Sequence, residues 1–117
     1  EERFTQSEML KFGRHFRLSK EVKVIIGRDQ SENETLESFF LKSQATFFEP
    51  ENFKGPSALA LGPLGVDDET LIVRLIARYA KNHPNQSNEI TVRSRMGMRT
   101  LKVTGSIDHE SAEKMRI

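Results

Sequence analysis

The clearest structural signal in this chain lies in residues 13–36, which read GRHFRLSKEVKVIIGRDQSENETL. The first part of the stretch alternates basic residues with Phe, Leu, Val and Ile, a spacing typical of strands with one buried face. Gly27-Arg28 then joins this segment to a capped amphipathic helix. Because a helix N-terminus offers unpaired N–H groups, a basic strand end beside it attracts phosphates. The junction is therefore our first candidate for a functional site.

Within this stretch we expect strands over residues 14–19 and 22–27, followed by a helix over residues 30–42. Asp29 is placed to cap the helix, and Glu32 stands at the capping-box position. The apolar stripe of the helix consists of Leu36, Phe39 and Phe40. The stretch thus predicts a hairpin that leads directly into a helix.

The rest of the chain continues the pattern of strand pairs followed by a helix. We expect strands at residues 45–49 and 57–61, a helix at residues 67–82 capped by Asp67, strands at residues 89–93 and 99–104 around Gly97, and a short helix at residues 108–115 capped by Asp108. In the second helix the expected shared face is Leu71, Leu75, Ile76 and Tyr79. The order β-β-α-β-β-α-β-β-α predicts an α+β fold with a mostly antiparallel sheet.

Length and composition favour one small domain with a single core, and 117 residues are few for an enzyme that builds its own catalytic cleft. The chain has no cysteine, which excludes disulfides, thiolate metal sites and a cysteine nucleophile. No apolar run approaches the roughly 20 residues of a membrane span, so we expect no membrane partner and a cytoplasmic protein. Because the chain begins at Glu1, we expect it to be a terminal piece of a longer polypeptide.

Charge is segregated along the chain, although the formal net charge of +1 is too mild to indicate nucleic-acid binding by itself. Residues 10–28 hold six basic side chains against Glu21 alone, and a second basic cluster surrounds Gly97. Such density is expected of hairpins that contact a phosphate backbone. The candidate binding residues are Arg14, Arg17, Lys23, Arg28, Arg93, Arg95, Arg99 and Lys102.

Each candidate has an alternative in which its charge serves the fold. Arg28 would then pair with Glu32, and both basic hairpins would be exposed, solubilising surfaces. Met96 and Met98 are suited to pack flexibly against a base or against another protein. The argument for the hairpins improves if both lie on one side of the sheet.

Phenylalanines occur in two adjacent pairs, at residues 39–40 and 47–48. At helix and strand spacing we expect at least one member of each pair to enter the core. Base stacking is the alternative for the other member. Tyr79 follows the same logic.

No catalytic constellation is visible. His15, His83 and His109 have no ligand spacing, so we expect no metal site. The segment after Gly27 lacks the Gly-Lys-Ser/Thr of a nucleotide-binding loop, and no serine stands in a G-x-S-x-G elbow. We therefore expect neither catalysis nor a cofactor in these residues.

Residues 23–34, KVIIGRDQSENE, resemble the strand-Gly-Arg-helix signature of the NFACT RNA-binding domains. Residues 13–18, GRHFRL, and residues 55–59, GPSAL, resemble a bacterial branch of that family. This branch is appended to tRNA-thiolation enzymes of the PP-loop ATPase type, which are similar to tRNA 2-thiouridylases and 4-thiouridine synthases. In order and spacing the likeness covers most of the chain.

One departure from the family pattern favours its tRNA-modification branch. The ribosome quality-control members carry an aromatic-Phe-His element after the first helix, where residues 45–50 read ATFFEP without the histidine. The resemblance therefore implies an accessory module that holds RNA, expected to be tRNA, for a sulfurtransferase catalytic domain of the same polypeptide. ATP would bind only in that catalytic part.

A protein-interaction or dimerisation module is the alternative from another class. Its contact surface would be the hydrophobic residues expected to be exposed, Phe53, Leu64, Met96 and Met98. A mass that depends on concentration would distinguish it from an RNA-binding module. The residues alone leave the oligomeric state open.

Overall fold

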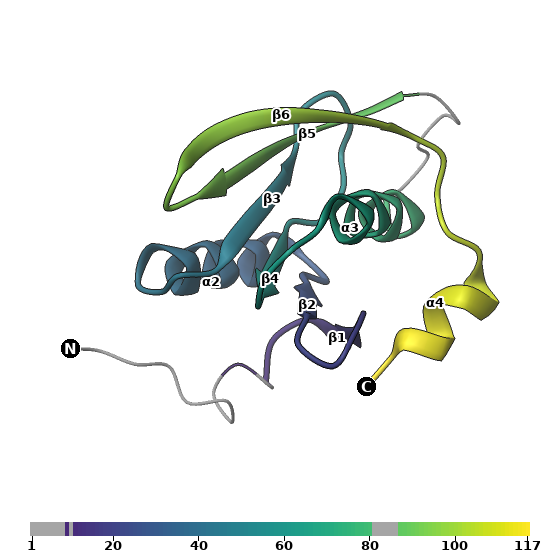
Figure 1. The fold of residues 1–117 in the computed structure, drawn as a ribbon, viewed down its shortest axis with the longest axis horizontal. Coiled ribbons are helices and arrows are strands. Elements are labelled where there is room, and N and C mark those ends of the chain that lie inside the picture. Colours follow the sequence, from purple (N-terminus) through teal and green to yellow (C-terminus); the bar gives the residue numbers. More distant parts are fainter. Residues whose placement is uncertain (1–8, 10, 81–86) are drawn as a thin grey trace.

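The computed structural model describes residues 9, 11–80 and 87–117, and the order of their elements confirms the α+β prediction (Figure 1). The elements are β1 (Arg14–Arg17), β2 (Lys23–Ile26), α2 (Gln30–Leu41), β3 (Thr46–Pro50), β4 (Ala58–Leu61), α3 (Val66–Arg78), β5 (Ser87–Ser94), β6 (Gly97–Thr104) and α4 (His109–Met115). Each strand pair expected from the sequence forms an antiparallel hairpin. No helix in the described part of the chain is both long enough and apolar enough to cross a membrane.

The strands form one antiparallel sheet in the order β1-β2-β4-β3-β5-β6. The contacts that join the hairpins are β2 with β4, where Ile25 pairs with Leu59, and β3 with β5, where Phe48 pairs with Val92. The first and last hairpins therefore occupy opposite edges of the sheet. Between them lies the central hairpin of β3 and β4, which is the most apolar.

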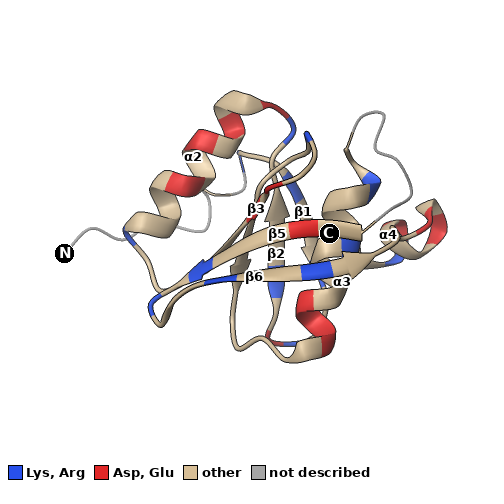
Figure 2. Cartoon of the chain, turned by 90° about the horizontal axis from the view of Figure 1, so that it is seen from above, with Lys and Arg blue, Asp and Glu red and all other residues tan. Residues whose placement is uncertain are grey.

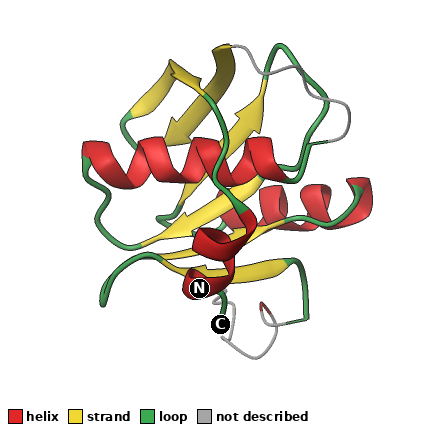
Figure 3. Cartoon of the chain, turned by 90° about the vertical axis from the view of Figure 1, so that its right-hand side faces the viewer, coloured by secondary structure: helices red, strands yellow, loops and turns green. Residues whose placement is uncertain are grey.

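Helices cover both faces of the sheet, α2 on one and α3 with α4 on the other (Figure 3). Successive strand residues point to opposite faces, so Ile25 packs beneath α2 while its neighbours Val24 and Ile26 pack beneath α3. Under α2 the core contains Leu36 and Phe39. The second core, under α3 and α4, is larger and includes Phe16, Phe48, Ile72, Leu75, Ile76, Ile90 and Ala112.

The aromatic pairs belong to the core, as predicted. Phe47 and Phe48 are 1 % and 0 % exposed, and they point to the two opposite faces of the sheet. Phe39 is buried, and Phe40 stacks on Phe47 with ring centroids 5.8 Å apart. These rings consequently stabilise the packing of α2 on β3.

Helix α3 begins earlier than the sequence indicates. The N-cap is Gly65, whose backbone N–H donates to Oδ2 of Asp68 at 2.9 Å, so Asp67 lies in the first turn instead of capping it. The Asp68 side chain, inside the helix, therefore satisfies the backbone N–H of the N-cap residue. The helical segment ends at Arg78, and Ile72 and Val73 are buried where Leu71 was expected to lead the apolar face.

Candidate functional site

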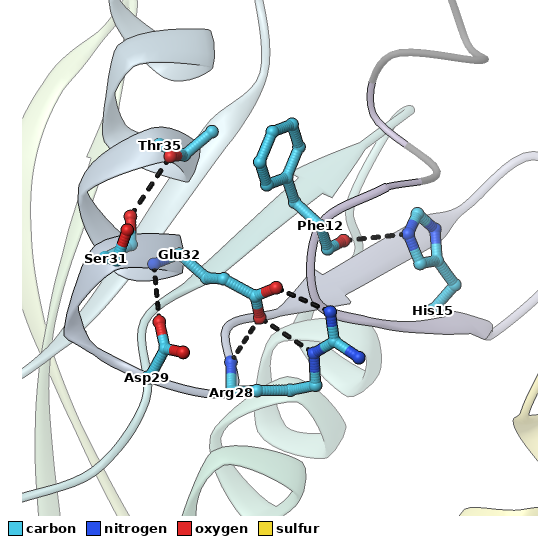
Figure 4. A network of polar contacts seen from close by, with 7 residues as sticks. All are labelled: Phe12, His15, Arg28, Asp29, Ser31, Glu32 and Thr35. Carbon is cyan, nitrogen blue, oxygen red and sulfur yellow. Dashed lines mark hydrogen bonds and ion pairs between the residues drawn. The ribbon is translucent and has the colours of Figure 1, made fainter.

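The junction of β2 and α2 is organised around Glu32 (Figure 4). Asp29 caps the helix as predicted, since its carboxylate accepts the Glu32 N–H at 2.9 Å. Glu32 in turn accepts hydrogen bonds from the backbone N–H of Arg28 at 2.9 Å and from its side-chain Nε and Nη2 at 2.9 and 2.6 Å. The Arg28 hydrogen bonds hold the pKa of Glu32 at about 2. The structure thus pairs Arg28 with Glu32, which is the alternative that the sequence left open.

Asn33 is a residue of this junction that the sequence analysis missed. Its Oδ1 accepts the Ser57 N–H at 3.1 Å, and the Gly27 N–H donates to the Ser57 carbonyl at 3.0 Å. A Cβ at Gly27 would overlap the Asn33 amide, so glycine is required for this close approach. The junction therefore ties the start of α2 to the start of β4. The glycine before the helix was the available signal.

The basic side chains of the first hairpin have three different environments. Arg14 is half-buried, with its guanidinium carbon 4.4 Å from the ring centroid of Tyr79. Arg17 is exposed and donates to the Lys20 carbonyl at 3.2 Å. Lys23 is only 7 % exposed, and its pKa is lowered by burial and by the neighbouring Arg17 charge. Of the predicted contacts in this hairpin, Arg17 has the most accessible charge.

His15, which lies between two of these residues, is also buried. Its ring Nε2–H donates to the Phe12 carbonyl at 2.9 Å, and burial lowers its pKa, with Lys23 acting in the same direction. The ring is therefore part of the packing under β1.

The second basic cluster is divided between paired and unpaired side chains. Arg93 bonds Glu37 of α2 at 2.6 Å and lies 5.0 Å from the ring of Phe40, while Arg99 pairs with Glu69 of α3. Arg95 and Lys102 are exposed and make no ion pair within the described residues; Lys102 is on β6 and Arg95 in the turn before it. The ion pairs with α2 and α3 thus leave Arg95 and Lys102 as the available cations of this cluster.

The fold does not bring the two hairpins together, because β1 and β6 are opposite edges of the sheet. Strand pairing does place Arg17, Lys23, Arg93 and Lys102 on the face that carries α2, and Arg14 and Arg99 on the face that carries α3. Acidic residues lie along α2 (Figure 2), which packs on the central strands, between the two edges of the sheet. The predicted residues therefore form two separate basic edges.

A further group of arginines, not foreseen from the sequence, surrounds the C-terminal end of α3. Arg74 donates to the Thr104 carbonyl at 3.2 Å, and Arg78 donates to Nδ1 of His109 at 2.8 Å. Arg116 pairs with β1 in a bridge to Phe16. The spacing of Arg74 and Arg78 on one helix face was the only sequence signal. Arg78 comes close to Arg14, at the ring of Tyr79, only through the tertiary fold.

A groove of about 430 Å³ lies between α2, β3 and the loop that follows β3. Its lining includes Glu34, Glu37 and Glu49 together with Phe53 and Lys54. Burial raises the pKa of Glu49, and the Glu37 charge adds to this effect. The negative lining makes the groove unsuitable for phosphate, and no group of metal-ligating side chains is found among the described residues.

The family model described as the NFACT protein RNA binding domain matches residues 13–115. No curated protein matches the chain. Among solved structures, the C-terminal part of the fibronectin/fibrinogen-binding protein from Streptococcus suis is similar, with a TM-score of 0.72 and 14 % identity over 100 % of this chain. The chain covers 51 % of that structure, and at this identity the likeness shows a shared fold.

Proposed function

Because the chain belongs to the family of NFACT protein RNA-binding domains, we propose that it binds tRNA as the non-catalytic RNA-binding module of a tRNA-modification enzyme. In this proposal the enzyme is a cytoplasmic tRNA sulfurtransferase, and a PP-loop domain of the same polypeptide holds ATP. The likeness of residues 13–18, 23–34 and 55–59 to the bacterial branch supports the thiolation context. The family match to residues 13–115 is the observation that carries RNA binding.

Unpaired cations at the two edges of the sheet support contact with a phosphate backbone. Arg17 at the β1 edge and Arg95 with Lys102 at the β6 edge are exposed and have no ion pair among the described residues. An exposed cation without a partner can displace counterions from RNA and gain binding free energy. Arg28, Arg93 and Arg99 would first have to leave a carboxylate. The unpaired group is therefore the proposed contact set.

The separation of the two basic edges is compatible with a structured RNA. Neighbouring strands lie about 4.8 Å apart, so β1 and β6 are about 24 Å apart along the sheet. A ligand that meets both edges must be long and rigid, as a folded RNA arm is. Recognition would depend on shape and phosphates, with little reading of bases.

A charge-matched pair of double variants tests this assignment. Arg95→Gln with Lys102→Gln removes two proposed contacts, and Lys54→Gln with Lys114→Gln removes the same charge from two exposed lysines outside both hairpins. We expect the first variant to weaken binding to bulk tRNA and to lower the log-log salt slope by about two, because each phosphate contact adds about 0.9. The control should lose much less affinity. Equal losses in the two variants would refute the hairpin as a contact site.

Protein interaction remains the second candidate function, and one observation favours it. Met96 and Met98 at the β5–β6 turn are 96 % and 73 % exposed. Phe53 and Leu64, which were expected to be exposed as well, are instead half-buried against the core beneath α3. Of the four residues expected to form the contact surface, Met96 and Met98 are thus the two that are exposed.

A further inference from the structure

The C-terminal end of α3 brings cations from separate parts of the chain to one aromatic ring. The guanidinium carbons of Arg14 and Arg78 lie 4.4 and 5.7 Å from the ring centroid of Tyr79. Both distances fall within the roughly 6 Å over which a cation is attracted to a ring face. Tyr79 also packs against Phe16 of β1, with ring centroids 6.0 Å apart. The ring is thereby fixed between α3 and the edge strand.

The side-chain donors of Arg14 are not used within the described structure. The guanidinium of this half-buried residue makes no ion pair or hydrogen bond to any described residue. Arg78 donates through Nη2 to Nδ1 of His109 at 2.8 Å, while its Nε is buried without a hydrogen-bond partner in the described part of the chain. Two guanidinium groups therefore share one ring without a carboxylate between them.

The acids of the adjacent helix α4 are engaged with other cations. Glu113 lies 3.8 Å from Arg116, and Glu110 lies 3.8 Å from Lys114. Arg14 and Arg78 consequently repel one another with only the ring face to offset their charge. An anion beside Arg14 would relieve that repulsion, and the planar fork of arginine matches the oxygens of a phosphate.

We propose that Arg14, seated on the ring of Tyr79, binds a phosphate of the RNA backbone, and that Arg78 adds positive potential at the same ring. The assignment rests on the proposed RNA-binding function and adds a site on the α3 face. Because guanidinium groups and Phe16 surround the ring, Tyr79 serves as a support for Arg14 and not as a base-stacking surface. Arg17 lies on the same strand with its side chain on the opposite face, so the Arg14 site is separate from the Arg17 contact.

Four variants separate the parts of this site by titration with bulk tRNA at several salt concentrations. Arg14→Gln should weaken binding about tenfold and lower the salt slope by about one. Arg14→Lys should keep the slope but lose about threefold in affinity, because lysine lacks the planar fork. Tyr79→Leu should also keep the salt slope but weaken tRNA binding, because Arg14 then lacks the ring that orients it. Tyr79→Phe should bind tRNA like the wild type, because it keeps the ring.

A second measurement uses inorganic phosphate in place of RNA. The side-chain Nε–Hε NMR resonances of Arg14 and Arg78 should shift on addition of phosphate and stay in place with chloride at the same ionic strength. If the wild type binds tRNA and Arg14→Gln binds it equally well with an unchanged slope, the Arg14 site is wrong while RNA binding stands. If the wild type does not bind tRNA, the proposed function fails. The phosphate titration then tests the Arg14 site independently of RNA. A shift that is selective for phosphate supports the site, and the absence of a shift contradicts it.

Discussion

At the residue scale, the carboxylate of Glu32 makes a contact that should be visible in the pH dependence of stability. Hydrogen bonds from Arg28 lower its pKa from 4.5 to about 2 in the folded chain. A carboxylate with a lowered folded pKa stabilises the fold above its unfolded pKa, and this contribution disappears as the pH falls from 4.5 towards 2. Glu32→Gln should therefore lower the free energy of unfolding by about 1 kcal/mol at pH 7 and have little effect near pH 2. Chemical denaturation at both pH values measures this difference.

Glu34→Gln is the matched control for that experiment, since it removes a carboxylate from the same helix. Glu34 is exposed and accepts a hydrogen bond only from Gln30, at 3.2 Å, among the described residues. A loss at pH 7 that is equal for both variants would contradict the role given to the Arg28–Glu32 pair. A loss in Glu32→Gln that persists at pH 2 would contradict it as well.

At the scale of elements, the turn after β4 depends on a glycine that no other residue can replace without strain. Gly62 has φ of 104°, in the left-handed region, and an added Cβ would overlap the Glu21 carbonyl. Gly62→Ala should lower the free energy of unfolding by about 2 to 4 kcal/mol, because backbone strain and a steric clash act together.

Gly97 provides the comparison, since its φ is 119° but nothing lies within 4 Å of an added Cβ. Gly97→Ala should therefore cost only the conformational strain, about 1 kcal/mol. Urea denaturation of both variants compares the two costs. Equal losses in the free energy of unfolding for Gly62→Ala and Gly97→Ala would show that the clash with the Glu21 carbonyl adds no cost.

Local patterns predicted most of the elements because each one carries its own signal. The alternation in residues 14–26 and the cap at Asp29 lie within a few residues of the structure they specify. The N-terminus of α3 was misplaced because the capping carboxylate comes from Asp68, inside the helix. The order of the strands was not predicted, since the pairing of β2 with β4 crosses a whole helix and a strand.

At the scale of the whole molecule, the candidate site was only partly predictable from the sequence. Charge density along the chain identified both basic hairpins, but it could not show that Arg93 and Arg99 pair with acids on distant helices. Nor could it show that Arg14 meets Arg78 at one ring, because these residues come together only when β1 packs beside α3. Sequence reasoning found the cations, and tertiary contacts decide which of them are available.

The oligomeric state separates the two candidate functions of the molecule. If the hairpin tip contacts RNA, the chain should sediment as a monomer whose mass does not change with concentration. Sedimentation equilibrium of the wild type and of Met96→Ser with Met98→Ser provides the measurement. A wild-type mass that rises with concentration, and that the double variant abolishes, would instead assign the exposed methionines to self-association.

The most direct test of RNA binding is a titration of the 117-residue chain with bulk tRNA at low and at physiological salt. Affinity and the log-log salt slope together count the phosphate contacts. Exposed cations at both edges of the sheet therefore predict saturable binding with a slope equivalent to several contacts. Absence of binding even at low salt would contradict the RNA-binding function.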